Sequence, residues 1–362
     1  MIYIGTDNGI YRWFPGAGWP IFHSLQECAV LDLASPGGGV MVAVDGGGRI
    51  WETIDNGQDW REVSPPEGAD RPTALALVDT PASLVLATRP LALHRRAIGP
   101  DPAEVKPNAL DLAGQQVAAM IELAARLTRR GQGTEGALAV AERPAGQTDP
   151  MAWTALGQPT AAPEGVAPRI RRIEIGLNSW FAAVVGAGLW RSTDAGSTWQ
   201  ECPGLPTEVY AIRISQGVVA LATSDGCWIS LDDGETWEDR SGGLEACRHV
   251  RALDIKPGNP KILLAGTAPD ALGQGAAASR TGLGFALYES KDGGKTWTHV
   301  TRGFPEALEF DTIADIRYEP SHPEYAVIAL SSGELWSTRS DGLWWEPLAR
   351  QINSARVLCA AE

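Results

Sequence analysis

The 362-residue sequence predicts an all-β fold, a single closed β-propeller, from three observations. One short turn pattern recurs along the chain, an aromatic residue recurs shortly before each turn, and apolar triplets recur at blade-length intervals. Gly (41 residues) and Trp (14 residues) are abundant, as is typical of the hairpins and periodic aromatics of propeller blades. We therefore expect residues 1–362 to form one domain of repeated four-stranded sheets.

The recurring turn has a Ser or Thr, an Asp two residues later, a Gly two residues after that and a Trp three residues further on. Four copies are nearly complete: Asp55, Gly57 and Trp60; Asp194, Gly196 and Trp199; Asp232, Gly234 and Trp237; and Asp292, Gly294 and Trp297. A fifth, degenerate copy spans residues 338–345. The Asp can accept N–H groups of its own turn, and Gly tolerates the positive φ of a tight hairpin. We expect these residues to be structural, and their carboxylates not to be catalytic.

The strands are predicted from what surrounds each turn. An aromatic residue two positions before the turn predicts a third strand: Trp51, Trp190, Trp228, Tyr288 and Trp336. An apolar run that ends in Gly, as in residues 41–48, predicts a second strand and its hairpin. Apolar triplets with an acidic or variable middle residue predict first strands, and their middle residues are at positions 32, 76, 122, 174, 213, 254, 315 and 358.

Eight triplets predict eight blades, which is the preferred count. The alternative is seven blades with a helical insertion at residues 98–150. This segment lacks the turn pattern, and one face of a possible helix carries Val117, Met120, Ile121, Ala124 and Leu127. Eight is preferred because residues 84–90 and 138–144 resemble the same second strand in consecutive blades.

The two ends of the chain are each incomplete as a blade. Residues 1–25 hold three predicted strands without a first strand, and residues 355–362 hold a first strand with nothing after it. Pairing the two ends would complete one blade and close the ring, which removes exposed sheet edges.

The turn pattern resembles the Asp-box, or bacterial neuraminidase (BNR), repeat. The wider class is that of WD40/YVTN/BNR-like propellers. The repeat is shared by sialidases, xyloglucanases, the sortilin luminal domain and photosystem II assembly factors. The resemblance implies that each box joins the third and fourth strands at the outer rim. It also implies that ligands bind on the opposite face, which carries the loops between second and third strands and those between blades.

Composition limits the classes of partner and cofactor. The formal net charge of −14 would repel nucleic acid unless a local basic patch overrides it, and an acidic protein favours a basic or polar partner surface. The paired arginines at 95–96, 129–130 and 171–172 are interpreted as solvated surface. Five unpatterned cysteines and five histidines predict free thiols, with no metal and no cofactor. No secretory signal or membrane span is visible, so we expect a cytoplasmic protein without membrane insertion.

Candidate binding residues on the ligand face are Asp7, Asp45, Arg89, Arg143, Asp225, Arg248, Arg280 and Glu334. Loops between blades add Arg71, Glu306, Asp311 and the long segment 267–284. Trp19, Trp153 and Trp180 lie outside the turns and are further candidates for contact with a partner.

The leading functional prediction is a non-enzymatic scaffold that binds another protein through this face and segment 267–284. No residue is predicted to be catalytic. A sialidase is disfavoured because the Arg-Ile-Pro signature is absent and few tyrosines are available, although Arg89, Arg143 and Arg248 could converge. The alternative is a glycan-binding or glycoside hydrolase-like propeller, in which Asp7, Asp45 and Asp225 would form an acidic ring.

Overall fold

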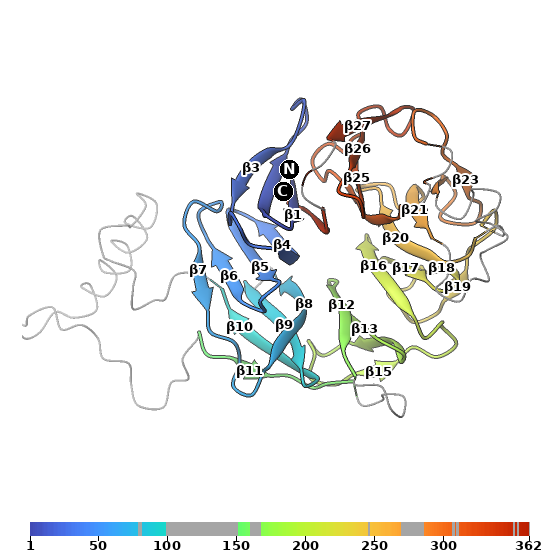
Figure 1. Ribbon diagram of the computed structural model, residues 1–362. Helices are drawn as coiled ribbons and strands as arrows, with labels where there is room; N and C mark the ends of the chain where they lie inside the picture. The colour runs from blue at the N-terminus through green and yellow to red at the C-terminus, as the bar shows by residue number, and fades with distance from the viewer. Residues whose placement is uncertain are drawn as a thin grey trace, which may run out of the picture.

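The computed structural model describes residues 1–78, 82–98, 151–159, 168–244, 247–268, 286–305, 308, 311–349, 352 and 355–361. These residues form seven four-stranded antiparallel sheets arranged around a centre (Figure 1). Among them, no helix is long and apolar enough to cross a membrane.

Each sheet is described from its innermost strand outward. The first holds β28 (Val357–Ala360), β1 (Ile2–Thr6), β2 (Gly9–Trp13) and β3 (Ile21–Ser24). The second holds β4 (Val30–Gly37), β5 (Val40–Asp45), β6 (Ile50–Thr53) and β7 (Arg61–Val63), and the third holds β8 (Arg71–Val78), β9 (Ser83–Arg89), β10 (Ala92–Ala97) and β11 (Thr154–Ala155).

Each of the remaining four sheets consists of four consecutive strands, given again from the innermost strand outward. The fourth holds β12 (Ile170–Ile175), β13 (Trp180–Val184), β14 (Gly188–Ser192) and β15 (Gln200–Glu201), and the fifth holds β16 (Val209–Ser215), β17 (Val218–Thr223), β18 (Gly226–Ser230) and β19 (Glu238–Asp239). The sixth holds β20 (Val250–Ile255), β21 (Leu263–Thr267), β22 (Leu287–Ser290) and β23 (Thr298–His299), and the seventh holds β24 (Ile313–Tyr318), β25 (Ala326–Leu330), β26 (Leu335–Thr338) and β27 (Trp345–Ala349).

The preferred count of eight blades is wrong, because the structure has seven. Segment 99–150 lies between β10 and β11, and these two strands pair within one sheet, with His94 opposite Ala155. The next innermost strand, β12, packs directly against β8, so no further blade separates them. The first strand predicted around position 122 and the alternative helix both lie outside the described residues.

Both chain ends contribute to one sheet. β28 pairs antiparallel with β1, with Ile2 opposite Ala360 and Gly5 opposite Val357. β28 also packs against β4 of the second sheet and β24 of the seventh, so that the innermost strands contact one another around the whole ring. The seven innermost strands surround a central channel, and their inward-facing residues determine its chemistry.

The second strands are the most buried because they are covered on both faces. β13, β21 and β25 are buried at every residue. Apolar side chains of adjacent sheets meet between the blades: Val42 and Val44 of the second sheet, for example, share a core with Leu84 and Leu86 of the third. Burial of such surface on both sides of each sheet is the main force that holds neighbouring blades together.

The four Asp turns join third and fourth strands, and their hydrogen bonds explain the residue pattern. Asp194 accepts the Thr198 N–H at 2.8 Å and the hydroxyls of Ser192 and Thr198 at 2.8 and 2.6 Å. Gly196 has a φ of +84°, which is unfavourable for other residues. Asp232 and Asp292 make the same set of bonds, and the Asp55 carboxylate also accepts the N–H groups of its turn.

These hydrogen bonds predict a loss of stability in acid. The Thr198 hydroxyl and N–H lower the pKa of Asp194 to about 2, and the corresponding threonines lower those of Asp232 and Asp292 to about 2. An unfolded Asp titrates near pH 3.9. Because the folded pKa is the lower one, the stabilisation is complete above about pH 4 and is lost as the pH falls toward 2. Urea unfolding at a series of pH values should show this decline, and a variant with all three aspartates changed to Asn should show a shallower one. Equal slopes for the two proteins would contradict it.

Candidate binding site at the mouth of the central channel

One end of the ring carries the turns between second and third strands, together with the beginnings of the first strands. The pairings Val30 opposite Asp45 and Arg71 opposite Arg89 place these groups at the same end. Asp7, Asp225 and Glu334 follow second strands in the same way. We call this end the mouth of the channel.

The three candidate aspartates at the rim of the mouth are each paired locally. Asp7 binds Arg356, and Asp225 binds Arg248 at 2.6 Å. Asp45 is buried and accepts Arg49 Nε at 2.7 Å and Trp51 Nε1 at 3.1 Å. Burial raises the pKa of Asp45, but the bonds from Trp51 and Arg49 outweigh it and hold the pKa below its ordinary value. These three aspartates therefore do not form an acidic ring of unpaired carboxylates.

Of the arginines that could converge, Arg89 and Arg248 lie within the described residues, and neither lines the channel. Arg248 is occupied by Asp225 and by Asp239, which lies 2.7 Å away. Arg89 is exposed at the end of β9. The remaining candidates differ in their surroundings: Asp311 accepts the N–H of Ser332, Glu334 is half-buried, Trp19 is exposed, Trp153 donates to Ser64 O and Trp180 is buried. Arg143, Arg280, Glu306 and nearly all of segment 267–284 lie outside the described residues.

The mouth itself is lined by residues of the first strands. Register shifts in these strands turn the side chains of those residues toward the channel. Six of the seven innermost strands contain such a shift near their beginning. The extra residues at these shifts are Leu31, Thr73, Arg171, Tyr210, Arg251 and Ala314, and all six line one cavity of about 420 Å³. A β-bulge redirects a side chain in this way, so one local device repeated around the ring builds the site.

Three of the bulge residues form a cationic and aromatic cluster. Tyr210 contacts two guanidinium groups, with Arg171 Cζ 4.8 Å and Arg251 Cζ 4.4 Å from its ring centroid. Its other neighbour is His249, which stacks on it with centroids 4.9 Å apart. Burial lowers the pKa of Arg171, Glu208 at 2.7 Å opposes this shift, and Arg251 adds to it. Cation–π contact and this salt bridge keep the two guanidinium groups in place at the mouth.

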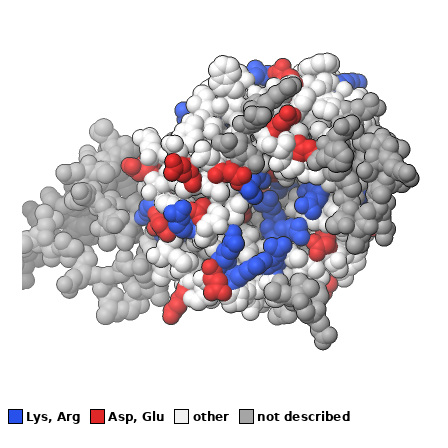
Figure 2. Space-filling model, viewed as in Figure 1, with Lys and Arg blue, Asp and Glu red and all other residues white. Residues whose placement is uncertain are grey.

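The arginines stand out because the rest of the protein is acidic. Figure 2 shows Lys and Arg side chains gathered over the centre of the ring, with Asp and Glu side chains around them. Arg172 and Arg213 extend the basic lining toward the floor of the cavity. The sequence-based interpretation of Arg171 and Arg172 as solvated surface is therefore wrong: both line the channel.

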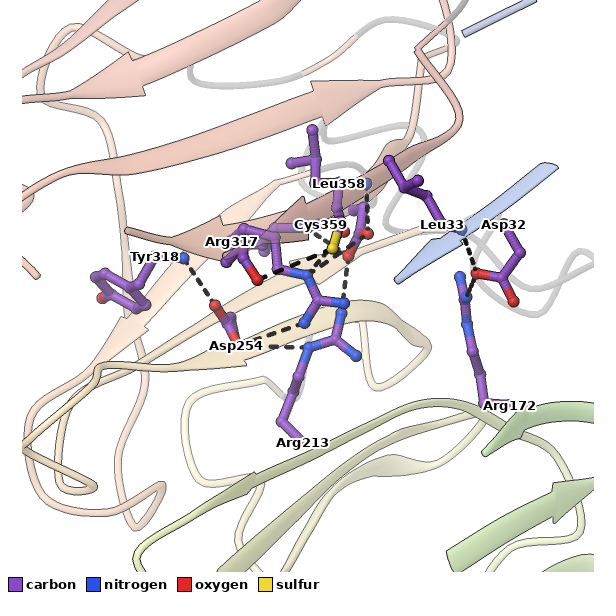
Figure 3. A network of polar contacts seen from close by, with 12 residues as sticks. Asp32, Leu33, Arg172, Arg213, Asp254, Arg317, Tyr318, Leu358 and Cys359 are labelled. Carbon is purple, nitrogen blue, oxygen red and sulfur yellow. Dashed lines mark hydrogen bonds and ion pairs between the residues drawn. The ribbon is translucent and has the colours of Figure 1, made fainter. Parts of the chain in front are cut away.

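The floor of the cavity is a buried ionic network (Figure 3). Arg213 contacts Asp315 at 2.9 Å and Asp254 at 3.3 Å, and Arg317 lies 4.0 Å from both carboxylates. Arg172 of β12 binds Asp32 of β4 at 3.3 Å. Burial raises the pKa of Asp254, whereas for Asp315 the charges of Arg317 and Arg213 outweigh burial and lower the pKa.

The two carboxylates of this network hold neighbouring strands together and are not placed for acid–base chemistry. Asp254 also accepts the Tyr318 N–H at 2.7 Å, and Asp315 accepts the Leu358 N–H at 3.0 Å. A glycosidase requires one carboxyl that can donate a proton and one carboxylate that can reach substrate or water. Both carboxylates here are bound by arginine and backbone donors, so they lack the freedom for either role.

A second cavity of about 440 Å³ lies on the other side of the network. It shares Asp32, Arg172 and Arg213 with the mouth and is further lined by Glu174 and Arg317. The ionic network thus divides the channel into two chambers.

The bulge residues that line the mouth can be located from a fixed spacing in the sequence. In β8, β12, β16 and β20 the bulge residue lies three positions before the middle residue of the first-strand triplet. Applying that offset to the triplets at 174, 213 and 254 identifies Arg171, Tyr210 and Arg251.

Comparison with known proteins supports the fold and nothing finer. No known family profile matches the chain, and no curated protein matches it in sequence. The structure of YCF48 bound to D1 peptide is similar, with a TM-score of 0.54, 14% identity and coverage of 93% of this chain and 86% of that one. The GH74 xyloglucanase from Xanthomonas campestris has a TM-score of 0.60 and 15% identity, and GH74 from Niastella koreensis has 0.61 and 12%. These two matches include 96% and 95% of this chain but only 52% and 51% of the respective enzymes.

The seven sheets and these likenesses define the chain as a β-propeller protein. At such low identity the resemblance extends to the fold alone. The finer assignment to Asp-box propellers is therefore taken up below as part of the proposal.

Proposed function

We propose that this protein is a non-enzymatic scaffold of the Asp-box propeller type, which binds an acidic segment of a partner protein at the mouth of its channel. The observation that carries the proposal is the group of arginines around Tyr210 in a cavity open at the centre of the ring. Arg251 makes no ion pair with any carboxylate among the described residues, so its guanidinium is available to an incoming carboxylate. Guanidinium groups bind carboxylates through paired, charge-assisted hydrogen bonds.

The local charge changes the expected partner. The net charge of −14 favours a basic partner for the protein as a whole. The mouth, however, is locally basic, so a partner segment that binds there is expected to be acidic. A protein segment fits better than nucleic acid, because an extended polyanion would also pass over the aspartates at the rim. The fold likeness to YCF48 bound to D1 peptide is consistent with a propeller that holds a peptide.

Binding of a labelled oligoglutamate peptide, followed by fluorescence anisotropy, tests the proposal. The wild-type protein should bind it in a salt-sensitive manner, and the double variant Arg171→Ala/Arg251→Ala should bind about tenfold more weakly or not at all. Arg302→Ala, which removes an exposed arginine distant from the mouth, is the matched control. Equal affinity of all three proteins would contradict the assignment of the mouth.

Two further probes separate the alternatives. Tighter binding of a single-stranded oligonucleotide than of oligoglutamate would favour nucleic acid. Release of reducing ends from xyloglucan would overturn the non-enzymatic assignment and favour the glycoside hydrolase-like alternative, which the fold likeness to the GH74 enzymes keeps open.

A further inference from the structure

The outer edge of the first sheet differs from the other outer edges. β3 is the outermost strand of that sheet and pairs only with β2 among the described strands (Figure 1). Its residues Ile21 and Phe22 are 44% and 42% exposed. Phe14 and Trp19, in the turn that leads into β3, are 39% and 72% exposed and extend this apolar edge.

The other outer strands are protected from edge-to-edge pairing. Each is very short, carries charge or contains proline: Arg61–Val63, Thr154–Ala155, Gln200–Glu201, Glu238–Asp239, Thr298–His299, and Trp345–Ala349 with Pro347. These are the usual means by which sheet proteins prevent unwanted strand addition. β3 has four residues, no charged side chain and no proline. Among the outer strands that the structure describes, β3 therefore has the edge that is most open to a further strand.

Phe22 is held in place for such a contact. It lies opposite Tyr11 on β2, and the two rings meet edge to face with centroids 5.5 Å apart. The neighbouring turn of the second sheet rests on the far end of β3, where Gly57 lies close to His23 and Ser24. The strand is thus fixed at one end by its neighbour and exposed at Ile21 and Phe22.

We infer that β3 is a self-association edge, at which a second copy of this chain adds its own β3 antiparallel to form a continuous eight-stranded sheet. Antiparallel pairing of identical strands is two-fold symmetric, so the same residues supply both sides of the contact. Charge selects this edge: two copies with a net charge of −14 repel each other, but no charged residue occurs from 14 to 26. The apolar residues beside the strand would be buried on both copies at once. This surface is separate from the mouth.

Sedimentation equilibrium of the full chain, from sub-micromolar to high-micromolar concentration, tests the inference. The wild type should form a dimer, and Ile21→Lys should weaken it about tenfold or more, since each copy would bring a lysine ammonium into an otherwise apolar contact. Thr298→Lys on β23 is the matched control, because it adds the same charge to another outer strand. Hydrogen exchange at residues 21–24 should slow as the wild-type concentration rises.

A second variant separates loss of the edge from loss of the fold. Trp19→Ser changes only a mostly exposed turn residue and should also weaken the dimer. A wild-type protein that stays monomeric over the whole range, or a dimer that both Ile21→Lys and Trp19→Ser leave unchanged, would overturn the inference.

Discussion

Replacing Asp315 with alanine is expected to lower the free energy of unfolding by about 3–5 kcal/mol, because the guanidinium groups of Arg213 and Arg317 would then share a single buried carboxylate, that of Asp254. Asp315 is 3% exposed and binds Arg213 at 2.9 Å across the channel. It also accepts the Leu358 N–H at 3.0 Å. One side chain on β24 thereby ties together β16 and β28, which belong to two other sheets. Urea unfolding followed by Trp fluorescence measures the loss.

The matched control for Asp315→Ala is Asp225→Ala. Asp225 also pairs with an arginine, Arg248, but its side chain is 63% exposed, so its loss should cost at most about 1 kcal/mol. Hydrogen exchange gives a second readout, since the Leu358 amide should exchange faster in Asp315→Ala than in Asp225→Ala. If the two variants were equally stable, the network would not hold the ring together in the way described.

Local patterns predicted most of the fold. The Asp turns were identified because a short carboxylate, a positive-φ glycine and a Trp are all needed within one hairpin, and Asp194, Asp232 and Asp292 show that requirement in their hydrogen bonds. Seven of the predicted first strands coincide with β4, β8, β12, β16, β20, β24 and β28. The eighth, around position 122, lies outside the described residues, and counting it led to the wrong number of blades because an apolar triplet alone does not show that a further four-stranded sheet is present.

The site could not be predicted in the same way because its partners are far apart in the sequence. Arg213 and Asp315 are separated by 102 positions, and Arg172 and Asp32 by 140. A triplet shows that its middle residue faces inward but does not show which residue lies across the ring. From the sequence alone the double arginine 171–172 is predicted to be solvated surface, since only the register shift in β12 reveals that both residues line the channel.

Deleting residues 354–362 is expected to unfold or aggregate the protein. The deletion removes β28, and with it the strand that covers the inner edge of β1 from Ile2 to Gly5. Val357 and Leu358 are almost fully buried, so their loss also opens the cores on either side of the sheet. An uncovered strand with buried apolar residues is a template for aggregation. Solubility, followed by thermal unfolding of any soluble fraction, measures the effect.

Two comparisons make this deletion informative. Removing Glu362 alone should have little effect, because β28 ends at Ala360. A synthetic peptide of residues 354–362, added during refolding of the truncated chain, should restore solubility if the missing strand is what the sheet requires. In any fraction of the truncated chain that still folds, Asp315→Ala should cost less than in the intact chain, because the deletion has already removed the Leu358 N–H that Asp315 accepts. An unchanged melting temperature after the deletion would show that the ring holds together without its last strand, and the contacts of β1 with β4 and with the core of the seventh sheet would then have to account for its stability.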